Sequence, residues 1–508
     1  MDLLHFICTV LISGMPRIND NHILKSPIPN GLAQRQMVFH DTQTSAGNSF
    51  GQRYFIKPSS YTPPLILEPG IGTQKLVVFN VGDVHLDNVL DLHKKEDLEE
   101  NGNTKKKSYS ENPERIHFRK WLTNNVIPEL ENKKNEVILV LNGDIIDFNA
   151  SCGDTFLWDE KTKETNNESV LKVLNEIIKN NLSVFNELKS FLNGSENSRI
   201  VYTFGNHDKI IEDCELIQDK LLEYLMPNLS PDKRKEKFVF TSSLEIKEMG
   251  LHIEHCHRLD PFNYSKKEEL TWGDWYTVKM VNGLFKQIEK KLQSIELPEK
   301  IFDKLQRKLK EMTIVRPTSA IPMYFPALAE RFKNHHCSDA ALAKKIQETI
   351  ASFSKDFGGI LMETPIIKKL KRLPFFPESF VKAILSNQTT QTFLVKTIGI
   401  IEYWKTDSNK DQIKEVLRLE EERKDLGIFV GAHTHNHADT PGKIHYFNPG
   451  AWKPVISAYR RGWEWFFPEN SILNGNALRL ETNLTSTKRR RHVHYKMPPY
   501  EGTIFVNK

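Results

Sequence analysis

Cysteine is scarce in this chain and follows no pairing pattern. The 508 residues include five cysteines, Cys8, Cys152, Cys214, Cys256 and Cys337, and no two of them form a CxxC pair. An odd, scattered set argues against both a disulfide framework and a thiolate zinc site. The cysteine usage therefore favours a reducing compartment, and we expect a cytoplasmic protein.

An apolar run long enough to cross a membrane is missing from the start of the chain. The stretch Leu3–Ile12 is apolar but too short to span a bilayer. It also lacks the basic residues and the small-residue cleavage site of a signal peptide, because Asp2 precedes it and Arg17 is the first basic side chain. Secretion is therefore the less favoured expectation.

A strong charge of either sign is missing as well. The net charge of +5 is small beside 70 basic and 65 acidic residues, so the whole molecule is not built to bind a polyanion. The basic run Lys488–Arg491 is local, and such a run is more often a solvated terminus. We therefore do not expect nucleic acid as a partner.

Short apolar runs alternate with helical stretches in the first half of the chain, after a lead-in over residues 1–70 that we expect to be poorly ordered. Helices are predicted over Pro113–Leu130 and Ser169–Leu192. This alternation is typical of a layered α/β domain. The predicted buried strands are Lys75–Val81, Glu136–Leu141, Arg199–Phe204, Leu251–Glu254 and Gly427–Val430.

Residues 264–425 have a different pattern, with apolar side chains at helical spacing in 284–295 and again in 301–309. We predict a mostly helical insertion that overhangs the functional site as a cap. The core would then comprise residues 71–263 as a first part and residues 426–508 as its completion with a C-terminal tail.

Polar motifs follow all five predicted strands. Taken singly, a D-x-H or H-x-H is common, and GDxxD or GNHD can be a turn. Five such motifs in one order, each at a strand end, predict a shared site at one edge of the fold. The motifs are Gly82-Asp83-Val84-His85, Gly143-Asp144-Ile145-Ile146-Asp147, Gly205-Asn206-His207-Asp208, His255-Cys256-His257 and Gly431-Ala432-His433-Thr434-His435.

The donor types in these motifs predict a metal site. Carboxylate, carboxamide and imidazole groups suit Mn²⁺, Fe or Zn²⁺. Two metals about 3.5–4 Å apart share a ligand and a bridging water whose pKa falls toward neutrality. A single carboxylate such as Asp144 can serve both ions.

The ordered motifs resemble the calcineurin-like metallophosphoesterases over residues 75–454, excluding the insertion. The resemblance continues through Tyr446–Gly450, which is similar to the strand and turn after the last histidine pair of that family. It implies a four-layered α/β/β/α sandwich and hydrolysis of a phosphomonoester or phosphodiester by a metal-bridging hydroxide. It also implies two divalent metal ions, with Mn²⁺ preferred and Fe or Zn²⁺ as alternatives.

The same resemblance implies roles for individual residues. His207 would stand beside the scissile phosphate as a proton donor or charge stabiliser, and Asp208 would fix its ring. Asp147 would lie behind the ligands without binding metal. One metal would take Asp83, His85, Asp144 and His435, and the other would take Asp144, Asn206, His255 and His433.

Two departures from the family pattern affect the site. Cys256 stands where the family usually has glycine, which puts the position of His257 in doubt, and Ala432 follows Gly431 where a histidine is common. Phe148 and Asp208 argue against the Ser/Thr protein phosphatase branch. The motifs are more similar to small bacterial phosphodiesterases and to the retromer subunit that shares their fold.

Two alternatives remain open. The chain could be a non-catalytic scaffold of this fold, although all the implied ligands are present. It could also hydrolyse a lipid-linked pyrophosphate, with the insertion as a lipid-binding cap, although the lipid A pathway enzymes typically carry Arg where His207 stands. The segment Pro365–Pro377 mixes four basic residues with apolar ones and could contact an anionic membrane. We favour a helix packed on the core with its lysines in solvent.

Overall fold

The computed structural model describes residues 64–88, 113–157, 166–260, 271–294, 409–457, 476–485 and 490–507, with short stretches between them. Most of the 1–70 lead-in, the apolar run Leu3–Ile12 and the segment Pro365–Pro377 lie outside the described residues. The predictions made for them therefore remain predictions.

Two mixed sheets form the centre of the fold. The larger has seven strands in the order β20-β19-β18-β2-β5-β6-β7. Four neighbours run parallel and three antiparallel strands complete the sheet. The parallel strands are β2 (Lys75–Val81), β5 (Asn135–Asn142), β6 (Ser198–Thr203) and β7 (Phe238–Thr241), and the others are β18 (Leu478–Asn483), β19 (Arg490–Met497) and β20 (Tyr500–Asn507).

The second sheet has six strands in the order β1-β8-β9-β11-β13-β12. Its central strands β9, β11 and β13 are parallel, while β8 and β12 run antiparallel to their neighbours β9 and β13. The strands are β1 (Leu65–Ile66), β8 (Ser243–Ile246), β9 (Leu251–Glu254), β11 (Ile428–Val430), β12 (Ala438–Thr440) and β13 (His445–Asn448).

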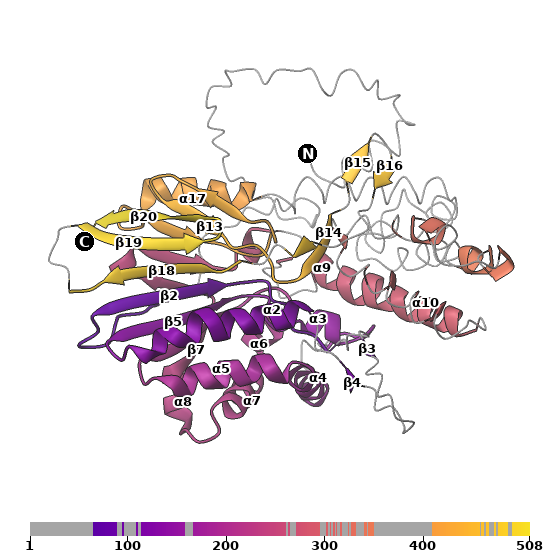
Figure 1. Cartoon of the computed structure of the whole chain (residues 1–508), viewed down its shortest axis with the longest axis horizontal. Helices are drawn as coiled ribbons and strands as arrows, with labels where there is room; N and C mark the ends of the chain where they lie inside the picture. The colour runs from indigo at the N-terminus through magenta and orange to yellow at the C-terminus, as the bar shows by residue number, and fades with distance from the viewer. Residues whose placement is uncertain are drawn as a thin grey trace, which may run out of the picture. The chain divides into compact units, whose positions relative to one another are not determined.

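Side chains alternate between the two faces of each strand and so contribute to two separate hydrophobic cores. In β2, Leu76 and Val78 pack with residues of the second sheet, whereas Val77 and Phe79 face the helices. A strand that is apolar on both faces can be covered on both faces, which explains the continuous apolar runs in the sequence. The helices on that outer face are α2 (Pro113–Trp121), α4 (Asn167–Asn180), α5 (Leu182–Gly194) and α7 (Glu215–Leu225). Figure 1 shows α2 and α5 close to β5, with α4 and α7 beyond α5.

One helix covers the other face of the six-stranded sheet. Val416 of α17 (Lys410–Glu422) belongs to a buried cluster with Phe429 of β11 and Tyr446 of β13. Figure 1 shows α17 above β13, away from the helices that pack on β2 and β5. The fold is therefore mixed α/β, with two mixed sheets and helices packed against both.

The predicted strands agree closely with the observed ones, and the predicted helices differ in detail. The helix expected over Ser169–Leu192 is broken at Asn181, whose side chain donates to the carbonyl oxygens of Ile177 and Asp87. The helix expected over Pro113–Leu130 ends as α2 at Trp121. The chain then continues as a π-helical turn over Leu122–Val126 and a 3₁₀-helical turn over Ile127–Glu131.

The described parts of residues 264–425, which we predict to be an insertion, are largely helical. They include α9 (Trp272–Trp275), a wide helical turn over Tyr276–Asn282, α10 (Gly283–Gln293) and α17. The Asn149 side chain in α3 (Phe148–Ser151) donates to Asp274 Oδ1 at 2.9 Å, so α9 contacts the helix that begins after Asp147. The domain boundaries and the cap remain predictions. In the described part of the chain, no helix is long and apolar enough to span a membrane.

Candidate metal centre

Five loops that follow parallel strands bring the predicted site residues together. The loops after β2, β5 and β6 come from the seven-stranded sheet, and those after β9 and β11 come from the six-stranded sheet. The site therefore lies where the carboxyl ends of strands from both sheets meet, as expected for a ligand site in an α/β fold.

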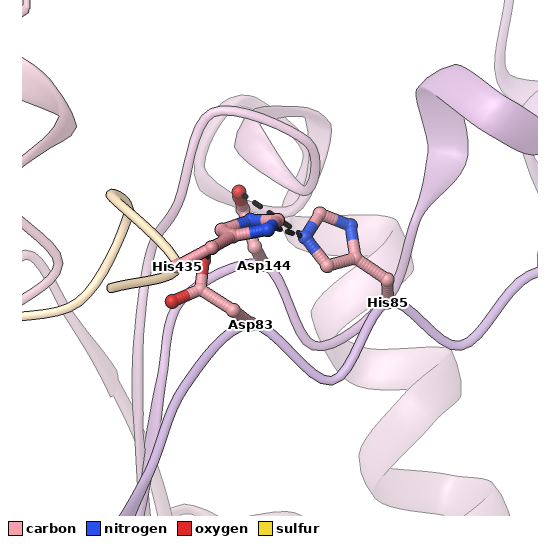
Figure 2. A group of neighbouring side chains, drawn as sticks. All are labelled: Asp83, His85, Asp144 and His435. Carbon is pink, nitrogen blue, oxygen red and sulfur yellow. Dashed lines mark hydrogen bonds and ion pairs between the residues drawn. The ribbon is translucent and has the colours of Figure 1, made fainter. Parts of the chain in front are cut away.

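Asp83, His85, Asp144 and His435 form the first group, with one ligand atom from each lying within 4.8 Å of all the others. Figure 2 shows the four side chains turned toward one another. His85 Nε2 lies 3.1 Å from His435 Nε2, and His435 Nε2 lies 3.3 Å from Asp83 Oδ1. This is the same set that the resemblance implies for one metal.

Asp144, His255 and His433 form a second group by the same criterion. His255 Nε2 lies 3.3 Å from Asp144 Oδ2, while Asp144 Oδ1 accepts a hydrogen bond from the backbone N–H of His207 at 2.8 Å. Asp144 thus belongs to both groups. Asn206 follows β6 in the adjoining loop and is buried.

The backbone is strained at these positions. Positive φ angles occur at Asp83 (53°), His85 (52°), Asp144 (53°), His433 (73°) and His435 (59°). L-residues avoid this left-handed region, at a cost of roughly 1–3 kcal/mol each, unless the surrounding structure enforces it. Such outliers tend to cluster where side chains are aimed for function.

Two glycines let these loops approach each other. An added Cβ at Gly143 would lie 2.4 Å from the His255 ring, and one at Gly205 would lie 2.2 Å from Asp144 Oδ1. The glycines of the GDIID and GNHD motifs are therefore needed for close packing around Asp144. The lack of room for a Cβ atom explains why both motifs begin with glycine.

Four buried atoms at the site make no well-formed hydrogen bond among the described residues, although two of them lie 3.3 Å from another ligand atom: Asp83 Oδ1, Asn206 Oδ1, His255 Nε2 and His433 Nδ1. Unmatched buried acceptors are rare and call for an explanation. All four are acceptor types that bind divalent cations. The donor set therefore fits metal ions.

The other ring nitrogen of each of three histidines is held in place. His85 Nδ1 lies 2.9 Å from Asp147 Oδ2, and His255 Nδ1 lies 2.9 Å from the carbonyl oxygen of Asn142. His433 Nε2 lies 3.1 Å from Asp260 Oδ2. Such partners fix the tautomer and orientation of a ligating histidine, leaving the opposite nitrogen available.

The site also attracts positive charge. Burial alone would raise the pKa of Asp144, but the neighbouring imidazoles, with His255 first, hold it well below its usual range. Burial alone would lower the pKa of His255, yet the carboxylates of Asp144 and Asp83 raise it to about 9. The buried carboxylates of Asp83 and Asp144 are therefore stabilised by positive charge nearby, either on protonated histidines or on bound metal ions.

His207 lies beside the ligand groups, and its side chain is 20% exposed. Its Nδ1 atom lies 2.8 Å from Asp147 Oδ1. Burial lowers the pKa of His207, but Asp147 and Asp144 outweigh that effect and raise it to about 9. The two carboxylates therefore favour the protonated form of His207, whose side chain is partly exposed to solvent.

The prediction that Asp208 orients His207 is wrong. Asp208 Oδ1 accepts from the backbone N–H of Gly205 at 2.6 Å, and its Oδ2 accepts from the Tyr202 hydroxyl at 2.5 Å and from the Ile145 backbone at 3.0 Å. Asp208 therefore braces the loops after β5 and β6. Asp147 orients His207, because it sits at the start of α3, where its carboxylate reaches both His85 and His207.

Cys256 adopts the left-handed conformation, with φ 71°, at the position where the family usually has glycine. Its side chain is buried in the cluster with Val416, Phe429 and Tyr446. His257 is buried too, with its ring centroid 5.5 Å from that of His255, but it belongs to neither ligand group. The Cys256 side chain, which a glycine would lack, thus packs on the side of α17.

Two residues near the site belong to none of the five motifs. Asp260 holds His433, and Lys453 has its Nζ atom 3.8 Å from Asp147 Oδ2. Neither belongs to a metal-ligand motif, so spacing carried no signal for them. In the sequence, Asp260 follows closely after His257 and Lys453 follows closely after Gly450, and this closeness is the signal that could have indicated them.

Comparisons with known proteins add little. No known family's sequence profile and no curated protein matches the chain. Among solved structures, the chain is similar to a dimetal phosphatase from Danio rerio at 10% identity and a TM-score of 0.27, over 85% of this chain and 99% of that chain. At that TM-score the likeness carries no argument, so the functional case depends on the site itself.

Proposed function

We propose that the protein is a metal-dependent phosphoesterase with two metal ions in one site. The observation that carries this proposal is the convergence of two ligand groups, drawn from the ends of strands in both sheets, on the shared carboxylate of Asp144. The packing of helices on the outer faces of the two sheets supports the four-layered α/β/β/α arrangement expected for such an enzyme.

Seven residues would hold the metals in this proposal. Asp83, His85 and His435 would hold one ion, Asn206, His255 and His433 would hold the other, and Asp144 would serve both. Bound divalent ions, with Mn²⁺ preferred, would supply Lewis acidity toward the phosphate and lower the pKa of an attacking water.

The departing oxygen of the substrate would also need a proton, which a side chain beside the metals would donate. His207, held by Asp147, would donate a proton from its free ring nitrogen to the departing oxygen of the substrate. A charged imidazole also stabilises the negative charge that develops there. The His207 side chain is 20% exposed, more than the 11% of His433 and the 12% of His435, so a phosphate group would approach the site from the side of His207.

A substrate panel tests the proposal. Chelator-treated protein is reloaded with Mn²⁺, Fe²⁺ or Zn²⁺ and assayed on phosphomonoesters, phosphodiesters, and pyrophosphates with and without a lipid tail. Wild type is compared with Asp144→Ala and with Asp219→Ala, a control that removes an exposed carboxylate from α7. Hydrolysis that needs metal, is lost in Asp144→Ala and persists in Asp219→Ala would support the proposal.

The same experiment separates the alternatives. Two bound metals with no turnover of any substrate would favour the scaffold function. Activity confined to lipid-linked pyrophosphates would favour the lipid-binding cap.

A further inference from the structure

Lys453 places a mostly buried ammonium group near Asp147, the carboxylate that holds His207. Its side chain is 11% exposed, and its Nζ atom lies 3.8 Å from Asp147 Oδ2 and 4.0 Å from Asp87 Oδ2. Both distances are too long for hydrogen bonds. Within the described part of the chain, the structure contains no hydrogen bond from Lys453 to any other group.

Both carboxylates near Lys453 already have closer partners. Asp87 Oδ1 accepts from Arg115 at 2.7 Å. Asp147 lies 2.9 Å from His85 Nδ1 and 2.8 Å from His207 Nδ1. Neither acid therefore needs the lysine to satisfy it, and the three N–H donors of the ammonium remain available.

The position of Lys453 is tied to the site. The backbone N–H of the preceding residue, Trp452, donates to the carbonyl oxygen of Asp83 at 3.1 Å, and the Trp452 side chain packs in the core with Phe118. Lys453 and His207 approach opposite oxygens of the Asp147 carboxylate. An anion that reaches His207 from solvent therefore comes close to a second cation.

We propose that Lys453 is a substrate-binding residue that donates hydrogen bonds to the phosphate and makes the site prefer phosphomonoesters to phosphodiesters. This inference rests on the proposed function. A monoester carries about 1.5 to 2 negative charges at neutral pH, whereas a diester carries one. A cation in a desolvated site favours the more highly charged ligand, because Coulomb energy grows with ligand charge.

Three variants in the full-length, Mn²⁺-loaded protein test this role. Lys453→Met removes the charge and keeps the length of the side chain, Lys453→Arg keeps the charge, and Lys220→Met removes a lysine that is 50% exposed on α7. Each is assayed on p-nitrophenyl phosphate and bis(p-nitrophenyl) phosphate. Binding of inorganic phosphate is measured by calorimetry, with metal content and thermal unfolding as checks.

We expect Lys453→Met to reduce kcat/KM for the monoester by about 10- to 100-fold, mainly through KM, as the loss of a charged hydrogen bond does. The diester should lose no more than about 3-fold. The dissociation constant for phosphate should rise by the same factor as the monoester KM. Lys453→Arg should retain most of the monoester preference, and Lys220→Met should match wild type.

Equal losses for monoester and diester, with phosphate affinity unchanged, would overturn the proposal and assign Lys453 to holding Asp147. If wild type hydrolyses neither substrate, the proposed function fails. Phosphate binding then still decides about Lys453, because unchanged affinity in Lys453→Met excludes it as a phosphate ligand. Lys453→Gln replaces Lys453→Met if the latter does not fold.

Discussion

Asp147 Oδ1 lies 2.8 Å from His207 Nδ1, so a carboxylate at the start of α3 orients the imidazole that extends beside the metal-ligand groups. Its other oxygen holds His85 at 2.9 Å. One carboxylate thereby links a candidate metal ligand to the candidate proton donor. A change in Asp147 should affect metal binding and proton transfer together.

Replacing His207 by Asn should lower kcat by roughly two to four orders of magnitude at unchanged metal content, as the loss of a general acid usually does. The loss should be smaller for p-nitrophenyl phosphate, because that leaving group needs no proton. Steady-state kinetics with good and poor leaving groups measure this. Equal losses for both would assign His207 to phosphate binding, and loss of metal would make it a ligand.

Replacing Asp147 by Asn should shift the alkaline limb of the kcat profile to lower pH. Burial lowers the pKa of His207, whereas Asp147 and Asp144 raise it to about 9, so removing one carboxylate lowers it. His207 donates only when protonated, and activity therefore falls as pH rises through that pKa. pH–rate profiles of both proteins at equal metal content test this.

Asp208→Asn is the matched control, because its carboxylate braces the Gly205 loop and not the His207 ring. The alkaline limb should stay in place in this variant while the protein becomes less stable. A shift of the limb in Asp208→Asn but not in Asp147→Asn would contradict the assignment.

Replacing Asp144 by Ala should cost more bound metal than any other single ligand change, because Asp144 alone belongs to both ligand groups. Metal analysis of purified variants after loading with Mn²⁺ measures the effect. Asn206→Ala should weaken one ion only. Retention of both metals in Asp144→Ala with loss of both in Asn206→Ala would show that Asp144 does not bridge.

A buried ion pair away from the ligands should make stability depend on pH. His252 Nδ1 lies 3.1 Å from Glu245 Oε1, and its Nε2 lies 3.7 Å from Glu254 Oε2. Burial lowers the pKa of His252, but these carboxylates raise it to about 9. Because the folded pKa exceeds the unfolded value near 6.5, the contribution is complete below about pH 6.5 and is lost as pH rises through about 9.

Unfolding by denaturant in the presence of chelator, for wild type and His252→Gln, measures this contribution. The difference in unfolding free energy should be roughly 1–3 kcal/mol at pH 6 and should shrink toward pH 9. Chelator keeps metal binding out of the comparison. A difference that grows with pH would contradict the assignment.

The features of this protein that depend on local pattern could be predicted from its sequence. Continuous apolar runs predict strands covered on both faces, and β2 and β9 have the predicted bounds. Because the carboxyl ends of parallel strands meet at one sheet edge, motifs at the ends of two such strands were enough to predict that Asp83 and Asp144 lie close together. Their roles as metal ligands remain predictions.

The side chains that hold the site residues in place could not be predicted, because they come from distant parts of the chain. Asp208 adjoins His207 in sequence, yet Asp147, 60 residues away, holds the ring, because α3 directs its carboxylate there. The break at Asn181 likewise depends on the carbonyl oxygen of Asp87, 94 residues away. Lys453 Nζ lies 3.8 Å from Asp147 Oδ2, although the two residues are far apart in the sequence. Spacing along a chain encodes none of these contacts, since side-chain partners are set by how distant segments pack.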